Sequence, residues 1–219
     1  MTRRIKQEHK FKKSFSQFIY SLFLDLRYGG KLLDSEKESQ YFSRGCYHTQ
    51  SVEYEELKHI FNDYEIEKDD VLLDVGCGRG RIFNFLLSKG LKNKMIGVEI
   101  DKEIADFTKK RLRRYDNIEI VNDDILEYNR KDVTIFFLFC PFDETLTERF
   151  FNIIEERYEN VKIIYYHPQF IDNIKLCKDW KITYKEFYSN IRRMKIKCAY
   201  MELHKAHKNN NDNLGDAHK

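Results

Sequence analysis

The 219-residue chain has few of the residues that mark fibrous, disulfide-bonded or membrane-spanning proteins. Two prolines and nine glycines exclude collagen-like and proline-rich classes. The five cysteines are odd in number and contain no C-x-x-C pair, so they predict no disulfide framework and no metal site, and they fit a reducing cytoplasm. No apolar run reaches the roughly 18 residues of a membrane-spanning helix, and the first residues lack the unbroken apolar core of a signal peptide. We therefore expect a cytoplasmic protein.

The chain also lacks an excess of one charge. It holds 39 Lys and Arg against 36 Asp and Glu, a formal charge of +3 on a chain that is 34% charged. Dedicated nucleic-acid binders carry a strong basic excess, so this balance argues against a nucleic-acid partner. Apolar residues, in contrast, make up 42% of the chain, which is enough for one substantial core. The length predicts one domain with extensions.

Residues 1–40 predict a basic, amphipathic helical extension. Residues 1–13 hold six Lys or Arg and one Glu. Apolar side chains then recur at spacings of three and four, which predicts a helix over 11–27 that Gly29 and Gly30 stop. We expect its apolar face to dock on the rest of the protein as a lid. The alternative is peripheral contact with an anionic membrane surface.

Residues 41–204 predict a single α/β domain, and the polar residues 205–219 predict a frayed tail. Short runs without polar alternation predict strands that are covered on both faces, at 71–75, 95–100, 118–121, 133–139 and 162–166. Predicted helices cover 52–63, 80–89, 102–113 and 144–157, and 180–187 and 194–202 predict an antiparallel hairpin. The fold class is thus α/β: a doubly wound, mostly parallel seven-stranded sheet with a C-terminal antiparallel hairpin and an N-terminal helical extension.

A glycine-rich turn follows the first predicted strand. This strand ends in Asp74, and Gly76, Gly78 and Gly80 follow at alternate positions before a helix. Glycines there let the backbone turn tightly and approach a ligand, although they also serve ordinary strand-to-helix turns. The third glycine comes one residue too early for the dinucleotide fingerprint. The carboxylate of Asp74 would repel a diphosphate but attract an ammonium group.

The run D-V-G-C-G-R-G from Asp74 resembles the first motif of class I S-adenosylmethionine-dependent methyltransferases. The resemblance covers about residues 40–170 and implies a Rossmann-like fold with S-adenosyl-L-methionine as the cofactor. It implies that Asp74 helps to hold the methionine part, that Glu99 after the second strand binds the ribose hydroxyls, and that Asp124, with its neighbour Asp123, meets the adenine. The implied cofactor-binding residues are Asp74, Gly76, Cys77, Gly78, Gly80, Glu99, Ile100, Asp123, Asp124, Ile125, Cys140, Tyr47 and Thr49.

Each of these acids alone is also typical of a helix cap or a solvated strand end. Their positions at the ends of three successive strands favour ligand binding, because the carboxyl ends of parallel strands meet at one edge of the sheet.

The fourth predicted strand ends in Cys140 and Pro141, where some amine and nucleobase methyltransferases carry Asn or Asp before Pro-Pro-aromatic. This departure argues against nucleobase N-methylation. Methyl transfer is an in-line displacement, and a hydroxyl or ammonium acceptor must lose a proton, for which His167 and Asp143 are the candidate catalytic residues. A solvated loop histidine is the alternative for His167. Cys140 is expected to pack at the strand end and not to act as a nucleophile.

The leading expectation is an enzyme that methylates a hydroxyl or amine of a small-molecule or saccharide acceptor. A protein lysine methyltransferase, with a protein acceptor, is the alternative within the same chemistry. A noncatalytic module that binds S-adenosylmethionine or S-adenosylhomocysteine is the alternative of another class.

Overall fold

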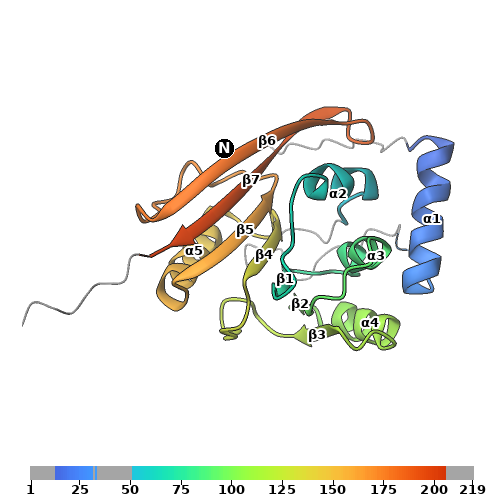
Figure 1. Cartoon of the computed structure of the whole chain (residues 1–219), viewed down its shortest axis with the longest axis horizontal. Coiled ribbons are helices and arrows are strands. Elements are labelled where there is room, and N and C mark those ends of the chain that lie inside the picture. Colours follow the sequence, from blue (N-terminus) through green and yellow to red (C-terminus); the bar gives the residue numbers. More distant parts are fainter. Residues whose placement is uncertain (1–12, 32, 34–50, 206–219) are drawn as a thin grey trace, which may run out of the picture.

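A computed structural model describes residues 13–31, 33 and 51–205 (Figure 1). The predicted site residues Tyr47 and Thr49 therefore lie outside the described residues. The helices are α1 (Phe15–Gly29), α2 (Tyr54–Phe61), α3 (Arg81–Ser88), α4 (Lys102–Leu112) and α5 (Glu144–Arg157). The strands are β1 (Leu72–Val75), β2 (Met95–Glu99), β3 (Ile118–Asn122), β4 (Ile135–Phe139), β5 (Asn160–Tyr166), β6 (Trp180–Ser189) and β7 (Met194–His204).

The seven strands form one sheet in the order β3-β2-β1-β4-β5-β7-β6. The first five strands in the chain pair in parallel, and β7 runs antiparallel to both β5 and β6. Helices α2, α3 and α4 cover one face and α5 covers the other (Figure 1). The predicted fold class, including the C-terminal hairpin, is confirmed.

The central strands are buried on both faces because their side chains alternate between two apolar layers. In β4, Phe137 points to the layer beneath α2 and α3, and Phe136 points to the layer beneath α5. Both phenylalanines are almost fully buried. Replacing such a phenylalanine with alanine costs about 3–5 kcal/mol of folding stability. The two layers therefore hold the strands, and with them the strand ends, in place.

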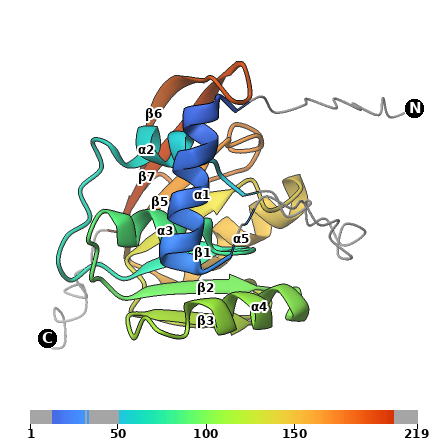
Figure 2. The ribbon, with the colours of Figure 1, turned by 90° about the vertical axis from the view of Figure 1, so that its right-hand side faces the viewer.

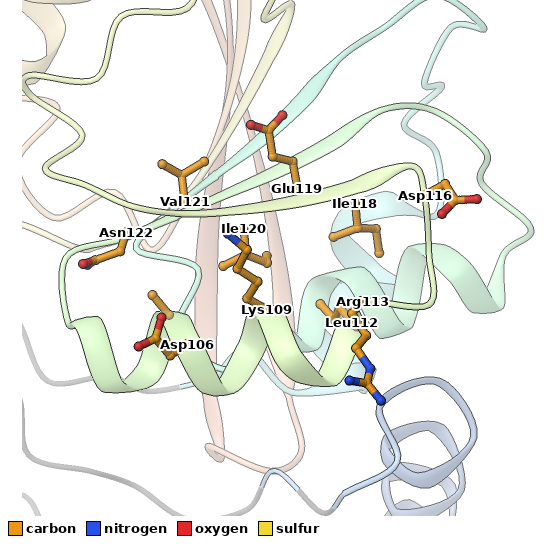
Figure 3. Close-up of a pocket in the computed structure, with 11 residues that line it drawn as sticks. Asp106, Lys109, Leu112, Arg113, Asp116, Ile118, Glu119, Ile120, Val121 and Asn122 are labelled. Atoms are coloured by element: carbon orange, nitrogen blue, oxygen red, sulfur yellow. The ribbon is translucent and has the colours of Figure 1, made fainter.

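The expected coverage on both faces is wrong for β3. This strand lies at the edge of the sheet, and only Ile120 is fully buried. A groove of about 660 Å³ runs between β3 and α4. Figure 3 shows Ile118 and Ile120 directed towards α4, whereas Glu119 points to the opposite side of the strand. An edge strand has only one neighbour, so short apolar runs in the sequence do not distinguish it from a central strand.

Helix α1 begins with a capping box between Ser14 and Gln17 and ends at Gly30, whose φ of 69° needs glycine. The expected inward orientation of its apolar face is wrong, because its buried residues include the polar Ser21 and Asp25, while Phe15 and Phe23 are exposed. No helix in the described part of the chain is both long and apolar enough to span a bilayer.

Candidate functional site

The turn between β1 and α3 uses glycine where the backbone conformation requires it. Gly76, Gly78 and Gly80 have φ values of 66°, 51° and 71°, in the left-handed region that other residues rarely adopt. Between them, the backbone N–H of Cys77 donates to the carbonyl oxygen of Val98 at 3.0 Å. The turn is therefore held against the end of β2.

Gly97 in β2 makes this close approach feasible, and the sequence analysis missed it. A Cβ atom at Gly97 would lie 2.7 Å from Sγ of Cys77 and 2.8 Å from Cδ1 of Ile120. Neither distance leaves room for a carbon atom. A glycine inside an apolar strand is the available sequence signal, since it often marks a close backbone approach.

Glu99 ties the end of β2 to the glycine turn. Its buried carboxylate accepts hydrogen bonds from the backbone N–H groups of Gly78 (2.8 Å) and Asp101 (2.9 Å). Burial raises the pKa of Glu99, and the backbone N–H groups of Asp101, Gly78 and Ile100 oppose that rise. Each oxygen of an ionised carboxylate has two acceptor positions, so the carboxylate keeps acceptor capacity for a ligand.

Asp74 lies at the end of β1, opposite Gly97 of β2 and Phe137 of β4. Its side chain is 6% exposed. Burial, and then the nearby charge of Glu99, raise the pKa of Asp74 well above its ordinary value. Two carboxylates buried beside a backbone turn form a site that a cation would stabilise.

Asp123 and Asp124, the acids after β3, cap the turn that follows them. Capping was the alternative to ligand binding that the sequence left open for these acids. Oδ1 of Asp123 accepts from the N–H of Asp124 (2.8 Å), and Oδ1 of Asp124 accepts from the N–H of Leu126 (2.9 Å). The backbone N–H of Asp123 also donates to the carbonyl oxygen of Glu99 at 3.2 Å. The ends of β2 and β3 are thus adjacent, with the half-buried Ile100 and Ile125 beside them.

On the other side of β1, Cys140 directly follows β4 with a φ of 36° and is almost fully buried. Burial raises the pKa of its thiol to about 11, so the thiol is protonated at neutral pH. Asp143 is the N-cap of α5 and accepts from the N–H of Leu146 at 2.9 Å. One oxygen of this candidate base is therefore engaged in capping a helix.

His167 directly follows β5, with a φ of 58°. Its half-buried ring places Nε2 at 3.2 Å from Nε2 of Gln169. Burial, and then the charge of Arg192, lower the pKa of His167. The imidazole is therefore neutral at physiological pH and has one nitrogen that can accept a proton.

The β6–β7 hairpin extends beyond the end of β5, a feature that the sequence did not reveal. Tyr166, the last residue of β5, pairs with Cys198, whereas β7 begins at Met194. At the tip, Arg192 donates from Nε to the fully buried carboxylate of Glu56 in α2 (2.7 Å), and its guanidinium lies 5.3 Å from the ring centre of Phe139. The hairpin tip thus lies beside the ends of β4 and β5.

Among the residues that the structure describes, no group of three or more His, Cys, Asp or Glu side chains is arranged to hold a metal ion.

Comparison with known proteins relates the middle of the chain to methyltransferases. Residues 72–162 match a family model described as a methyltransferase domain. An rRNA adenine N-6-methyltransferase of Lysinibacillus sphaericus is 30% identical over 92 residues, 42% of this chain and 34% of the relative. Ribosomal RNA small subunit methyltransferase A of Alkaliphilus metalliredigens is 28% identical over 92 residues, 42% of this chain and 31% of the relative. The matched part spans about a third of these relatives.

Two solved structures share the fold. An RNA methyltransferase from Salinibacter ruber, in complex with S-adenosyl-L-homocysteine, has a TM-score of 0.53 at 15% identity and covers 72% of this chain and 95% of its own. A putative methyltransferase, yhhF from Escherichia coli, has a TM-score of 0.54 at 16% identity and covers 70% and 86%. At these identities the likeness concerns the fold.

Proposed function

Because residues 72–162 form a class I S-adenosylmethionine-dependent methyltransferase domain with a Rossmann-like fold, we propose that the chain transfers a methyl group from S-adenosylmethionine to an acceptor beside the ends of β4 and β5. The observation that carries the proposal is the buried pair of Asp74 and Glu99 against the glycine turn. A cationic nucleoside complements this pair in charge and in hydrogen bonding.

The carboxylates at the strand ends fit the cofactor. The buried carboxylate of Asp74 is suited to the ammonium group of the methionine part, because a cation beside it would oppose the rise of its pKa that burial causes. The free acceptor positions of Glu99 match a ribose diol, and the remaining oxygen of Asp124 matches the adenine amino group. When bound, the cofactor supplies an electrophilic methyl group. The protein aligns it, excludes water and manages the acceptor's proton.

We propose that the acceptor is a hydroxyl or amine of a small molecule or saccharide. The neutral imidazole of His167 accepts the proton that such an acceptor loses. The amide of Gln169 contacts its ring, and the charge of Arg192 acts on it. Cys140 and Pro141 replace the Asn or Asp motif that grips a base or amine in some related enzymes.

An RNA acceptor is the second candidate, because two relatives that match this chain are named as methyltransferases of ribosomal RNA. The match spans only about a third of each relative.

The test starts with calorimetry of S-adenosylmethionine binding to the native chain and to Glu99→Ala. Loss of the buried hydrogen bonds should weaken binding by about 1–3 kcal/mol. Asp106→Asn removes an exposed acid of α4 and is the matched control, for which we expect unchanged affinity. Equal heats for native and Glu99→Ala would remove Glu99 from the site.

Transfer of labelled methyl from the cofactor into a fractionated lysate then identifies the acceptor. Label in small or glycan fractions supports the leading proposal. Label that ribonuclease releases supports the RNA candidate, and label in protein supports lysine methylation. Cofactor binding without transfer to any fraction would favour a noncatalytic binding module.

A further inference from the structure

Helix α1 is attached to the domain through polar groups. Asp25 in the middle of the helix is fully buried and accepts from the hydroxyl of Tyr54 (2.5 Å) and the backbone N–H of Leu33 (3.1 Å). The buried guanidinium of Arg81 lies 3.6 Å from the same carboxylate and 3.3 Å from Glu53. Arg81 is buried and therefore holds α1 against the domain.

Both ends of the helix are fixed as well. Near its start, Gln17 donates to Glu55 of α2 at 2.9 Å. Near its end, Gly29 lies against Arg111 of α4 so closely that a Cβ atom there would be 1.9 Å from Nη1. These three anchors set the rotation of α1 about its own axis, so its orientation is specified.

The opposite side of α1 is apolar and exposed. Phe15, Ile19, Phe23 and Leu26 recur along one stripe and are 81%, 45%, 59% and 50% exposed. Of the nine large exposed apolar side chains in the described part of the chain, six belong to α1. The helix stands at the margin of the molecule, and no other described helix or strand lies on its outer side (Figures 1 and 2). A contiguous apolar patch of this kind marks an interaction surface.

The charges around this stripe are basic. The only acid in α1 is Asp25, which is buried on the inner side. Six Lys or Arg and one Glu occupy residues 1–13, directly before the helix, and the exposed Arg27 and Lys31 lie at its other end. An aromatic and aliphatic face between basic residues is typical of helices that lie in the interface of an anionic membrane.

We propose that the outward stripe of α1, defined as Phe15, Ile19, Phe23 and Leu26, seats the protein on an anionic lipid surface. Such a surface offers both partners that the helix needs: an apolar layer for the stripe and negative headgroups for the flanking cations. A second copy of the chain offers only the first, because a dimer through α1 would bring two basic segments together.

Vesicle sedimentation of the full chain tests the proposal. We expect at least about tenfold stronger partitioning onto phosphatidylcholine vesicles containing about 30% phosphatidylglycerol than onto phosphatidylcholine alone, and a loss of this preference as salt is added. Ile19→Ser/Phe23→Ser should weaken partitioning at least about tenfold. The matched control is Tyr184→Ser/Tyr188→Ser, which removes two exposed aromatics of β6 and should leave partitioning unchanged.

Replacing Arg3, Arg4 and Lys6 with Ser should remove the preference for anionic vesicles while the apolar stripe is intact. Cofactor binding by calorimetry shows that every variant is folded. Equal partitioning onto both vesicle types, or none, overturns the proposal. So does a dimer in light scattering of the native chain that Ile19→Ser/Phe23→Ser converts to monomer, because the stripe would then bind a second copy.

Discussion

Substituting Asp74 by Asn should change stability and cofactor binding in opposite directions. In the cofactor-free protein, burial and Glu99 raise the pKa of Asp74. A carboxyl group whose pKa is higher in the folded than in the unfolded state contributes stability below its unfolded pKa of about 3.9, and this contribution is lost as the pH rises through the folded pKa. At any pH above this raised pKa, the ionised Asp74 is thus a net cost to the folded state.

The size of the effect follows from the burial of the group. Each unit by which the folded pKa exceeds the ordinary value corresponds to about 1.4 kcal/mol at a pH above both. The Asn amide lacks the charge but still needs hydrogen-bond partners, which offsets part of the gain. We therefore expect Asp74→Asn to stabilise the cofactor-free chain by about 0.5–2 kcal/mol, or a few degrees in melting temperature.

Cofactor affinity should fall at the same time. Asp74→Asn removes the proposed charge-assisted hydrogen bond to the ammonium group, which is worth about 1.5–3 kcal/mol, or roughly 10–150-fold in the dissociation constant. Urea unfolding without cofactor and calorimetry with S-adenosylmethionine measure the two quantities. Asp106→Asn, an exposed acid in α4, should change neither.

The pH dependence gives an independent check. The stability difference between the native chain and Asp74→Asn should shrink as the pH falls through the raised pKa of Asp74, because the native side chain then becomes neutral too. A variant that is less stable than the native chain at neutral pH and binds the cofactor equally well would refute the electrostatic account of the site.

Three further substitutions test the candidate site at the strand ends. Glu99→Gln leaves one acceptor oxygen for two backbone donors, so calorimetry should show about tenfold weaker cofactor binding, and unchanged affinity would contradict its role. Gly97→Ala forces a Cβ atom against Sγ of Cys77 and should cost about 1–3 kcal/mol in urea unfolding; an unchanged midpoint would show that the turn is looser than described. His167→Asn should slow transfer to a hydroxyl or ammonium acceptor by about 10²–10⁴-fold at unchanged cofactor affinity, and the native rate should rise with pH to an inflection below about 6.5, whereas an inflection above this value would exclude His167 as the base.

The sheet and its helices were predictable because burial on both faces leaves a direct signal in the sequence. β1, β2 and β4 are short runs of apolar residues, and the chain between strands keeps a helical period. The glycine turn was equally visible, since positive φ values at alternate positions demand glycine at those positions. Local rules of this kind need no knowledge of the neighbours.

Features that depend on neighbours were not predictable. Whether Glu99 accepts from the turn, or Glu56 lies buried beneath Arg192, depends on the register of segments far apart in the chain. The prediction that the apolar face of α1 turns inward was wrong for the same reason. Its apolar periodicity predicts the helix correctly, but an apolar face turns inward only where the opposite face finds no better partner, and here Asp25 finds Tyr54 and Arg81.

The polar network around Asp25 reaches the glycine turn between β1 and α3. Arg111, whose pKa burial lowers to about 10, donates to the carbonyl oxygens of Arg79 (2.5 Å) and Gly80 (3.2 Å) and to Oδ1 of Asn84 (2.8 Å), and Asn84 in turn donates to Tyr54 (3.0 Å). An apolar contact would let the helices slide by small amounts, whereas hydrogen bonds within a buried polar network require one particular geometry. The glycine turn is thus held by two contacts. The carboxylate of Glu99 binds the N–H of Gly78, and Arg111, which belongs to the network that holds α1, binds the carbonyl oxygens of Arg79 and Gly80. Loss of a network member would therefore loosen both the helix and the turn.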